Sequence, residues 1–159
     1  MEKEIYIAST FSLSEVPELL EHLNENTTPA WGSMNAQQMV EHLISSIRIS
    51  NGKTDVAKVP LLTPEEQLPA YREFLFSDRP FNRNTPNPLF DKGIPPLRAK
   101  DLDTAKARLV EELNDFFTHF EENPEKTIRH PFFGDLDFAG WQAFQRKHIA
   151  HHFSQFGLV

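Results

Sequence analysis

The sequence contains no cysteine among its 159 residues. This absence excludes disulfide frameworks, thiolate nucleophiles and cysteine-based zinc sites. A metal ion would therefore have to bind to histidine, carboxylate or amide groups. The lack of cysteine also suits a reducing compartment.

Basic segments and long apolar runs are lacking as well. The formal net charge is −7 and no run of Lys and Arg stands out, so we expect no nucleic-acid partner. The first ten residues, MEKEIYIAST, lack the apolar stretch of a signal peptide. No segment approaches the roughly 20 apolar residues that span a bilayer. We therefore expect a cytoplasmic protein without a membrane partner.

Phenylalanine (14 residues) and proline (12 residues) are abundant instead, and the prolines gather between Pro60 and Pro96. They mark a connection of roughly fifty residues, which is much longer than most loops. Within it, Thr63 and Pro64 predict the cap and first position of a short helix that continues to about Phe76. The following Pro-rich and Asn-rich stretch is predicted to be a loop.

Apolar residues at helical spacing predict four amphipathic helices within a single domain, residues 1–159. We expect them over residues 12–23, from 33 or 35 to 50, from 101 or 103 to 122, and over 137–155. Residues 130–136 are interpreted as an aromatic-rich turn, and the one candidate strand is 4–7. Four helices with one long Pro-rich connection between the second and third favour an all-α four-helix bundle. A connection that can cross the bundle favours an up-down-down-up order.

His148 and His152 are four residues apart in the last predicted helix, so both lie on one face and can reach one metal ion. The helical H-E-x-x-H zinc motif has the same spacing, but here no Glu follows the first His, which excludes that metalloprotease motif. A third ligand must come from another helix. His42 is the first candidate, because it borders the apolar stripe of the second helix.

Other histidines remain as alternatives for the third ligand. His119 is the second candidate, whereas His22 and His130 lie near a helix end and in a turn. Three imidazoles would leave a coordination position open, as in catalytic zinc sites, and an ion there can lower the pKa of bound water to about 7. The alternative is that histidines in the last turn of a helix only interact with its dipole.

The segment from Trp31 to Leu43, WGSMNAQQMVEHL, resembles the second helix of the DinB/YfiT-like superfamily. The ending, with HPFFG at 130–134, Trp141 and HIAHHFSQFG at 148–157, resembles the last helix of one branch of that superfamily. The resemblance implies a four-helix bundle, a homodimer, and a zinc or nickel ion held by His42, His148 and His152. Gln155 matches the glutamine that follows the last ligand by three residues. Members include thiol-dependent S-transferases and a thiol-dependent isomerase.

Further residues are candidates for contacts around the site. His151, Arg79 and Arg83 could touch the ligands or a substrate, and the alternative for each is an ordinary solvated side chain. Gln38 and Glu41 could accept a hydrogen bond from an imidazole, although helix geometry turns Glu41 away from His42.

We therefore expect a metal-dependent hydrolase or thiol-dependent transferase that acts on a small molecule. The catalytic residues and the substrate are not identified by the sequence. The alternatives are a helical bundle that the metal only stabilises, with His119 or a carboxylate as fourth ligand, and a dimeric interaction module.

Overall fold

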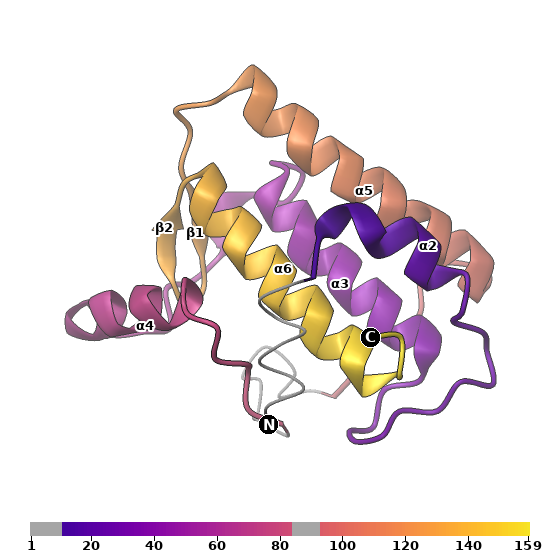
Figure 1. The fold of residues 1–159 in the computed structure, drawn as a ribbon. Coiled ribbons are helices and arrows are strands. Elements are labelled where there is room, and N and C mark those ends of the chain that lie inside the picture. The colour runs from indigo at the N-terminus through magenta and orange to yellow at the C-terminus, as the bar shows by residue number, and fades with distance from the viewer. Residues whose placement is uncertain (1–10, 84–92) are drawn as a thin grey trace.

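The computed structural model describes residues 11–83 and 93–159 of the chain. This part is mainly helical, with five α-helices and one small two-stranded sheet (Figure 1). The α-helices are α2 (Val16–Leu20), α3 (Ala36–Ser50), α4 (Leu68–Leu75), α5 (Leu102–Glu122) and α6 (Phe138–Gln155). Three short 3-10 helices, η1 (Leu13–Glu15), η2 (Val56–Lys58) and η3 (Glu65–Gln67), and the strands β1 (Ile128–His130) and β2 (Gly134–Leu136) complete the list.

The three long helices begin at polar capping residues. The side chains of Asn35, Asp101 and Asp137 accept hydrogen bonds from the backbone N–H groups three residues ahead. Such caps satisfy N–H groups that the first helical turn leaves without partners. The predicted helix starts and ends are confirmed at these three elements to within a few residues.

Helix α3 contacts both α5 and α6, and α2 lies against α5. The fully buried side chains include Met39, Leu43 and Ile47 of α3. Leu109 and Phe116 of α5, with Trp141 and Phe153 of α6, enter the same core. The apolar spacing that predicted helices therefore also predicted which faces are buried. None of the described helices is long and apolar enough to cross a membrane.

The predicted turn at 130–136 is confirmed at residues 131–133, but the flanking residues form a β-hairpin that the sequence did not predict. Strands β1 and β2 pair antiparallel, with Ile128 opposite Leu136 and His130 opposite Gly134. Gly134 has φ +74°, a conformation that favours glycine. The candidate strand at residues 4–7 lies outside the described residues.

Two other predicted helices begin with a 3-10 turn. The first is η1 followed by only five residues of α2, with Pro17 in its first turn, so it is shorter than expected. The helix in the long connection is η3 followed by α4, which confirms a short helix that continues to about Phe76, although Pro64 precedes η3 instead of starting it.

Candidate metal centre

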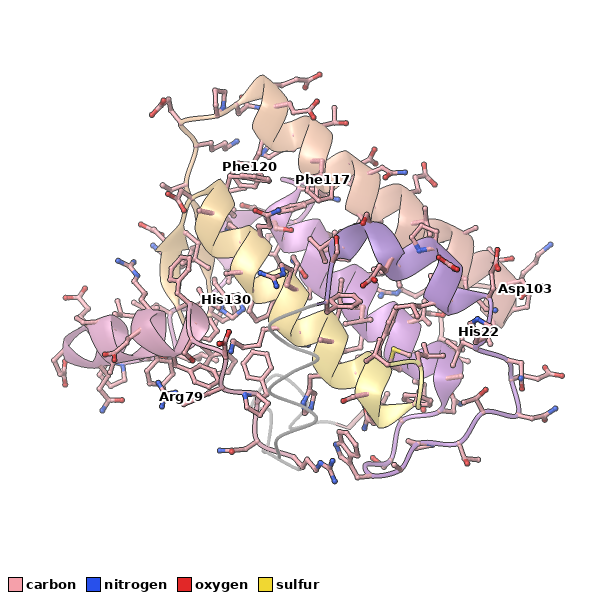
Figure 2. All side chains as sticks on the ribbon, in the orientation of Figure 1. His22, Arg79, Asp103, Phe117, Phe120 and His130 are labelled. Carbon is pink, nitrogen blue, oxygen red and sulfur yellow. The ribbon has the colours of Figure 1, made fainter. Side chains whose placement is uncertain are left out.

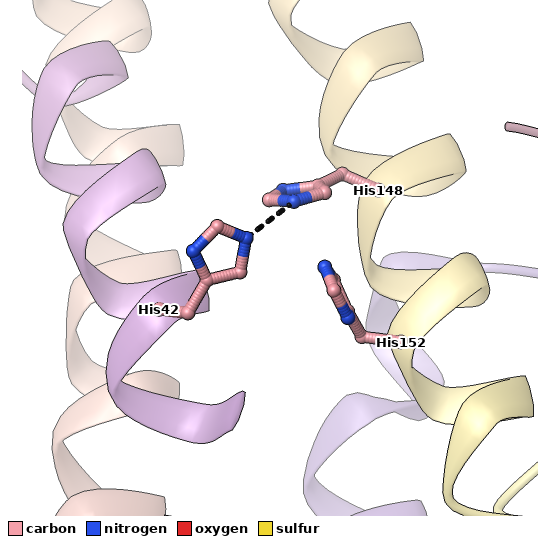
Figure 3. A group of neighbouring side chains, drawn as sticks. All are labelled: His42, His148 and His152. Carbon is pink, nitrogen blue, oxygen red and sulfur yellow. Dashed lines mark hydrogen bonds between the residues drawn. The ribbon is translucent and has the colours of Figure 1, made fainter. Parts of the chain in front are cut away.

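Three histidines from two helices point toward one another (Figure 3). His42 comes from the middle of α3, and His148 and His152 come from consecutive turns of α6. The Nε2 atoms of His42 and His148 are 3.0 Å apart. One potential ligand atom from each residue lies within 4.8 Å of the other two. Contact between α3 and α6 thus assembles a group that neither helix forms alone.

The spacing of this group fits a metal site. Two imidazole nitrogens, each about 2.0–2.1 Å from a zinc ion, lie roughly 2.9–3.4 Å apart for bond angles between 90° and tetrahedral. The 3.0 Å between His42 and His148 falls in this range. A group that spans up to 4.8 Å would have to contract by up to about 1.4 Å to reach the upper end of this range around an ion. Because all three donors are imidazoles, the group suits zinc, nickel, copper or iron.

The orientation of His152 is fixed by Gln155. The Nδ1 atom of His152 lies 2.8 Å from Oε1 of Gln155, and the Nε2 amide of Gln155 donates to the Trp31 carbonyl at 2.8 Å. Since the amide oxygen can only accept, the proton of His152 is placed on Nδ1, and the Nε2 lone pair is available for a metal. This arrangement is the usual support for a ligating histidine.

The two ring nitrogens of His148 differ in their hydrogen-bond partners. Its buried Nδ1 has no hydrogen-bond partner among the described residues, and its ring packs against Phe144, with centroids 5.0 Å apart. An unsatisfied buried polar atom costs about 1–3 kcal/mol. The polar partner of this imidazole among the described residues is the ring of His42, whose Nε2 lies at hydrogen-bond distance, 3.0 Å, from Nε2 of His148. A bond from the His148 Nε2 to an ion would replace this contact.

The environment keeps the cluster neutral. Burial, followed by the charge of His151, lowers the pKa of His42 to about 4. Burial also lowers the pKa of His148 and of His152 well below the ordinary value, and the neighbouring imidazoles add to the effect. At neutral pH the lone pairs are therefore free of protons, as metal binding requires.

The alternative third ligands lie elsewhere. His119 sits beside Gly52, past the C-terminal end of α3 and about 15 Å along the helix from His42. His22 and His130 do not belong to the group that could hold a metal, and Figure 2 labels both, although His130 lies close enough to His148 to lower its pKa. His130 is buried against Phe144 at 4.2 Å, and its Nδ1 accepts from the backbone N–H of Phe132 at 3.0 Å. Among the described histidines, carboxylates and cysteines, the group that could hold a metal contains only the three residues favoured by the sequence.

The other candidate residues divide into two sets. His151 lies next to His152, at 5.1 Å between ring centroids, and packs edge-on against Trp31 at 5.8 Å. The guanidinium of Arg83 lies over Trp31, at 4.0 Å from the ring centroid. Arg79 instead lies over Phe74 of α4, at 5.2 Å. The structure thus groups Arg83 and His151, whereas Arg79 belongs to another contact.

Gln38 and Glu41 do not act as acceptors for His42. Gln38 caps α3 through reciprocal hydrogen bonds with Asn35. Burial alone would raise the pKa of Glu41, but hydrogen bonds from Gln37, Arg98 and Ala99 bring it below the ordinary value. Glu41 therefore ties α3 to the segment before α5.

Three residues beside the site were not found from the sequence. Phe81 lies 6.2 Å from the ring of His148, and Trp31 accepts from Gln155. Lys147 is buried and donates from Nζ to the carbonyls of Ser77 (2.9 Å) and Arg79. These contacts hold residues 77–83 against α6. They join segments far apart in the sequence, so no local pattern could have indicated them.

Fold and site together define a mainly helical protein with a candidate three-histidine metal centre. Residues 9–157 match the model of the family DUF1569, described as a protein of unknown function, and the chain therefore belongs to that family. No curated protein and no solved structure matches the chain.

Proposed function

We propose that this protein is a metal-dependent enzyme, either a hydrolase or a thiol-dependent transferase. His42, His148 and His152 would hold one divalent ion, with zinc or nickel as the first candidates. The observation that carries the proposal is the convergence of three neutral imidazoles with no carboxylate in the group among the described residues. Three protein ligands leave a position for an exchangeable fourth, as in catalytic sites.

The chemistry would depend on that open position. A bound divalent ion would lower the pKa of a coordinated water or thiol, so that a nucleophile is available at neutral pH. The chain itself would supply orientation, through the hydrogen bond of Gln155 to His152. Phe81 and Phe144 would limit the access of water from the side of His148.

The same proposal includes the arrangement of the helices. The resemblance of residues 31–43 and 130–157 to the DinB/YfiT-like superfamily would make α2, α3, α5 and α6 a four-helix bundle in up-down-down-up order. The contacts of α3 with α5 and α6, and of α2 with α5, support the packing of these helices into one bundle. The homodimer implied by the resemblance is a further prediction, to be tested by sedimentation of the purified protein.

The test is whether a metal in this site has an exchangeable ligand. Cobalt-loaded protein is titrated with azide and with 2-mercaptoethanol while the visible absorption of the ion is followed. An open position predicts a new spectrum with each ligand, and a panel of esters, amides and thiol acceptors then identifies the reaction class. A cobalt spectrum that neither ligand changes would contradict the enzyme proposal and favour a metal that only stabilises the fold.

A further inference from the structure

One cation, Arg83, is linked to the three histidines through ring contacts, although the whole chain has a formal net charge of −7. Arg83 lies on the segment that Lys147 holds against α6, whereas the charges of Lys147 and Arg79 lie over Phe74 of α4. Asp78 is close enough to Lys147 to oppose its charge in part. A divalent ion bound by three neutral imidazoles would add two positive charges. The site is therefore suited to an anionic ligand.

Arg83 is the cation whose position is best defined for binding an anionic ligand. Its guanidinium carbon lies 4.0 Å from the centroid of Trp31, a distance typical of cation–π stacking. The backbone at Trp31 is in turn fixed, because its carbonyl accepts from Nε2 of Gln155 at 2.8 Å. In addition, Ala30 N–H donates to the carbonyl of Gln155 at 2.8 Å. The face of an exposed guanidinium is thus stacked on a ring that is anchored to α6.

A short run of rings connects this guanidinium to the histidine cluster. Trp31 packs against His151, and His151 packs against His152, with centroids 5.8 and 5.1 Å apart. On the same segment as Arg83, Phe81 lies 5.9 Å from His151 and 6.2 Å from His148. Arg83 is therefore two ring contacts from a proposed metal ligand.

We propose that Trp31, Arg83 and His151 form the anchoring subsite for a carboxylate on the substrate. This inference rests on the proposed function, since the reacting end of the same molecule would occupy the open position on the metal. The fork of N–H donors on a guanidinium binds a planar carboxylate in a bidentate manner. The apolar part of the substrate would lie along Phe81 and Trp31.

The experiment uses ligands with a metal-binding group at one end and a carboxylate at the other. Cobalt-loaded protein is titrated with the monohydroxamates of succinic, glutaric and adipic acids and with their methyl esters. We expect one chain length to bind about tenfold more tightly as the acid than as the ester, equivalent to about 1.4 kcal/mol. The preferred length then reports the distance between Arg83 and the ion.

Two variants test whether Arg83 causes the preference for the acid over the ester. Arg83→Gln is expected to remove the difference between acid and ester. Arg108→Gln, which changes an exposed arginine of α5 away from the cluster, is expected to keep it. Equal binding of acid and ester, or a preference that survives Arg83→Gln, would overturn the subsite and leave the metal centre intact. Failure of cobalt to bind the wild-type protein would overturn both proposals.

Discussion

The molecule contains two environments for histidine, one buried and one partly buried, and they differ in how the ring nitrogens are used. His130, in the hairpin, has an Nδ1 that accepts from the backbone N–H groups of Phe132 and Phe133, at 3.0 and 3.3 Å. His148, on α6, has an Nδ1 without a partner in the described part of the chain and an Nε2 that faces His42. Both rings contact Phe144. The shared contact with Phe144 therefore does not distinguish a structural histidine from a candidate ligand, whereas hydrogen bonding does.

The largest expected effect is on metal content. His148→Ala should reduce the metal bound by tag-free protein from roughly one ion per chain to a trace, because two imidazoles hold an ion much less tightly than three. His130→Asn should retain the metal, because it changes the other environment. Elemental analysis of both variants, purified without chelators, measures the difference. Equal metal content in the wild type and in His148→Ala would contradict the distinction between His148 as a ligand and His130 as a structural histidine.

The next-largest effect concerns the hydrogen bond to Gln155 that orients His152. Gln155→Leu removes the acceptor for Nδ1 of His152, and we expect metal affinity to fall by about 10- to 100-fold. Gln145→Leu is the matched control, since Gln145 is also buried on α6 but donates to Ser50 at 3.1 Å. Competition with a chromophoric chelator gives both affinities. A similar loss in the two variants would show that the effect is not specific to the ligand support.

The third prediction concerns how the free energy of unfolding changes with pH because of His130. Burial lowers its pKa to about 3, well below the value of about 6.5 expected in the unfolded chain. Between these values the unfolded state binds the proton and the folded state does not, so stability falls as the pH decreases from about 6.5 toward 3. One such group contributes a slope of up to about 1.4 kcal/mol per pH unit.

Urea unfolding of metal-free protein between pH 4.5 and 7.5 measures this slope. His130→Asn keeps an acceptor for the N–H two residues ahead and removes the titrating ring. The variant should be less stable at pH 7 but have a slope smaller by about one proton. An unchanged slope would mean that His130 is not the buried neutral imidazole described above.

The smallest effect is expected at Gly32, where φ is +83° and a Cβ atom would lie 2.5 Å from Nε2 of Gln155. Gly157, with φ +72°, has nothing within 4 Å of such an atom and provides the control. Alanine at either position should cost about 1–2 kcal/mol through backbone strain. Only Gly32→Ala should also weaken metal binding, because it displaces Gln155. Thermal unfolding and chelator competition separate the two effects.

The local features of the fold were predictable from the sequence because they depend on neighbouring residues. The caps Asn35, Asp101 and Asp137 and the apolar spacing behind them define α3, α5 and α6 within a few residues. The hairpin was missed because each strand has only three residues, too few for an alternating pattern. The hairpin also contacts α6 through β2, and the local sequence does not indicate that contact.

The candidate site was predictable only in part, because some of its contacts join residues that are far apart in the sequence. The spacing of His148 and His152 places two imidazoles on one face of a helix, and the position of His42 on a core-facing stripe indicated the third. Phe81, Trp31 and Lys147 act through contacts across 65 or more residues of sequence, for which a single sequence carries no periodic signal.

The most direct test of the account is an anomalous difference map from crystals of protein purified without chelators or grown with added zinc. The account predicts one metal peak bonded to Nε2 of His42, His148 and His152, with a ligand that is not a protein side chain at the remaining position. A peak at another site, no peak after zinc addition, or a fourth protein ligand that closes the site would contradict it.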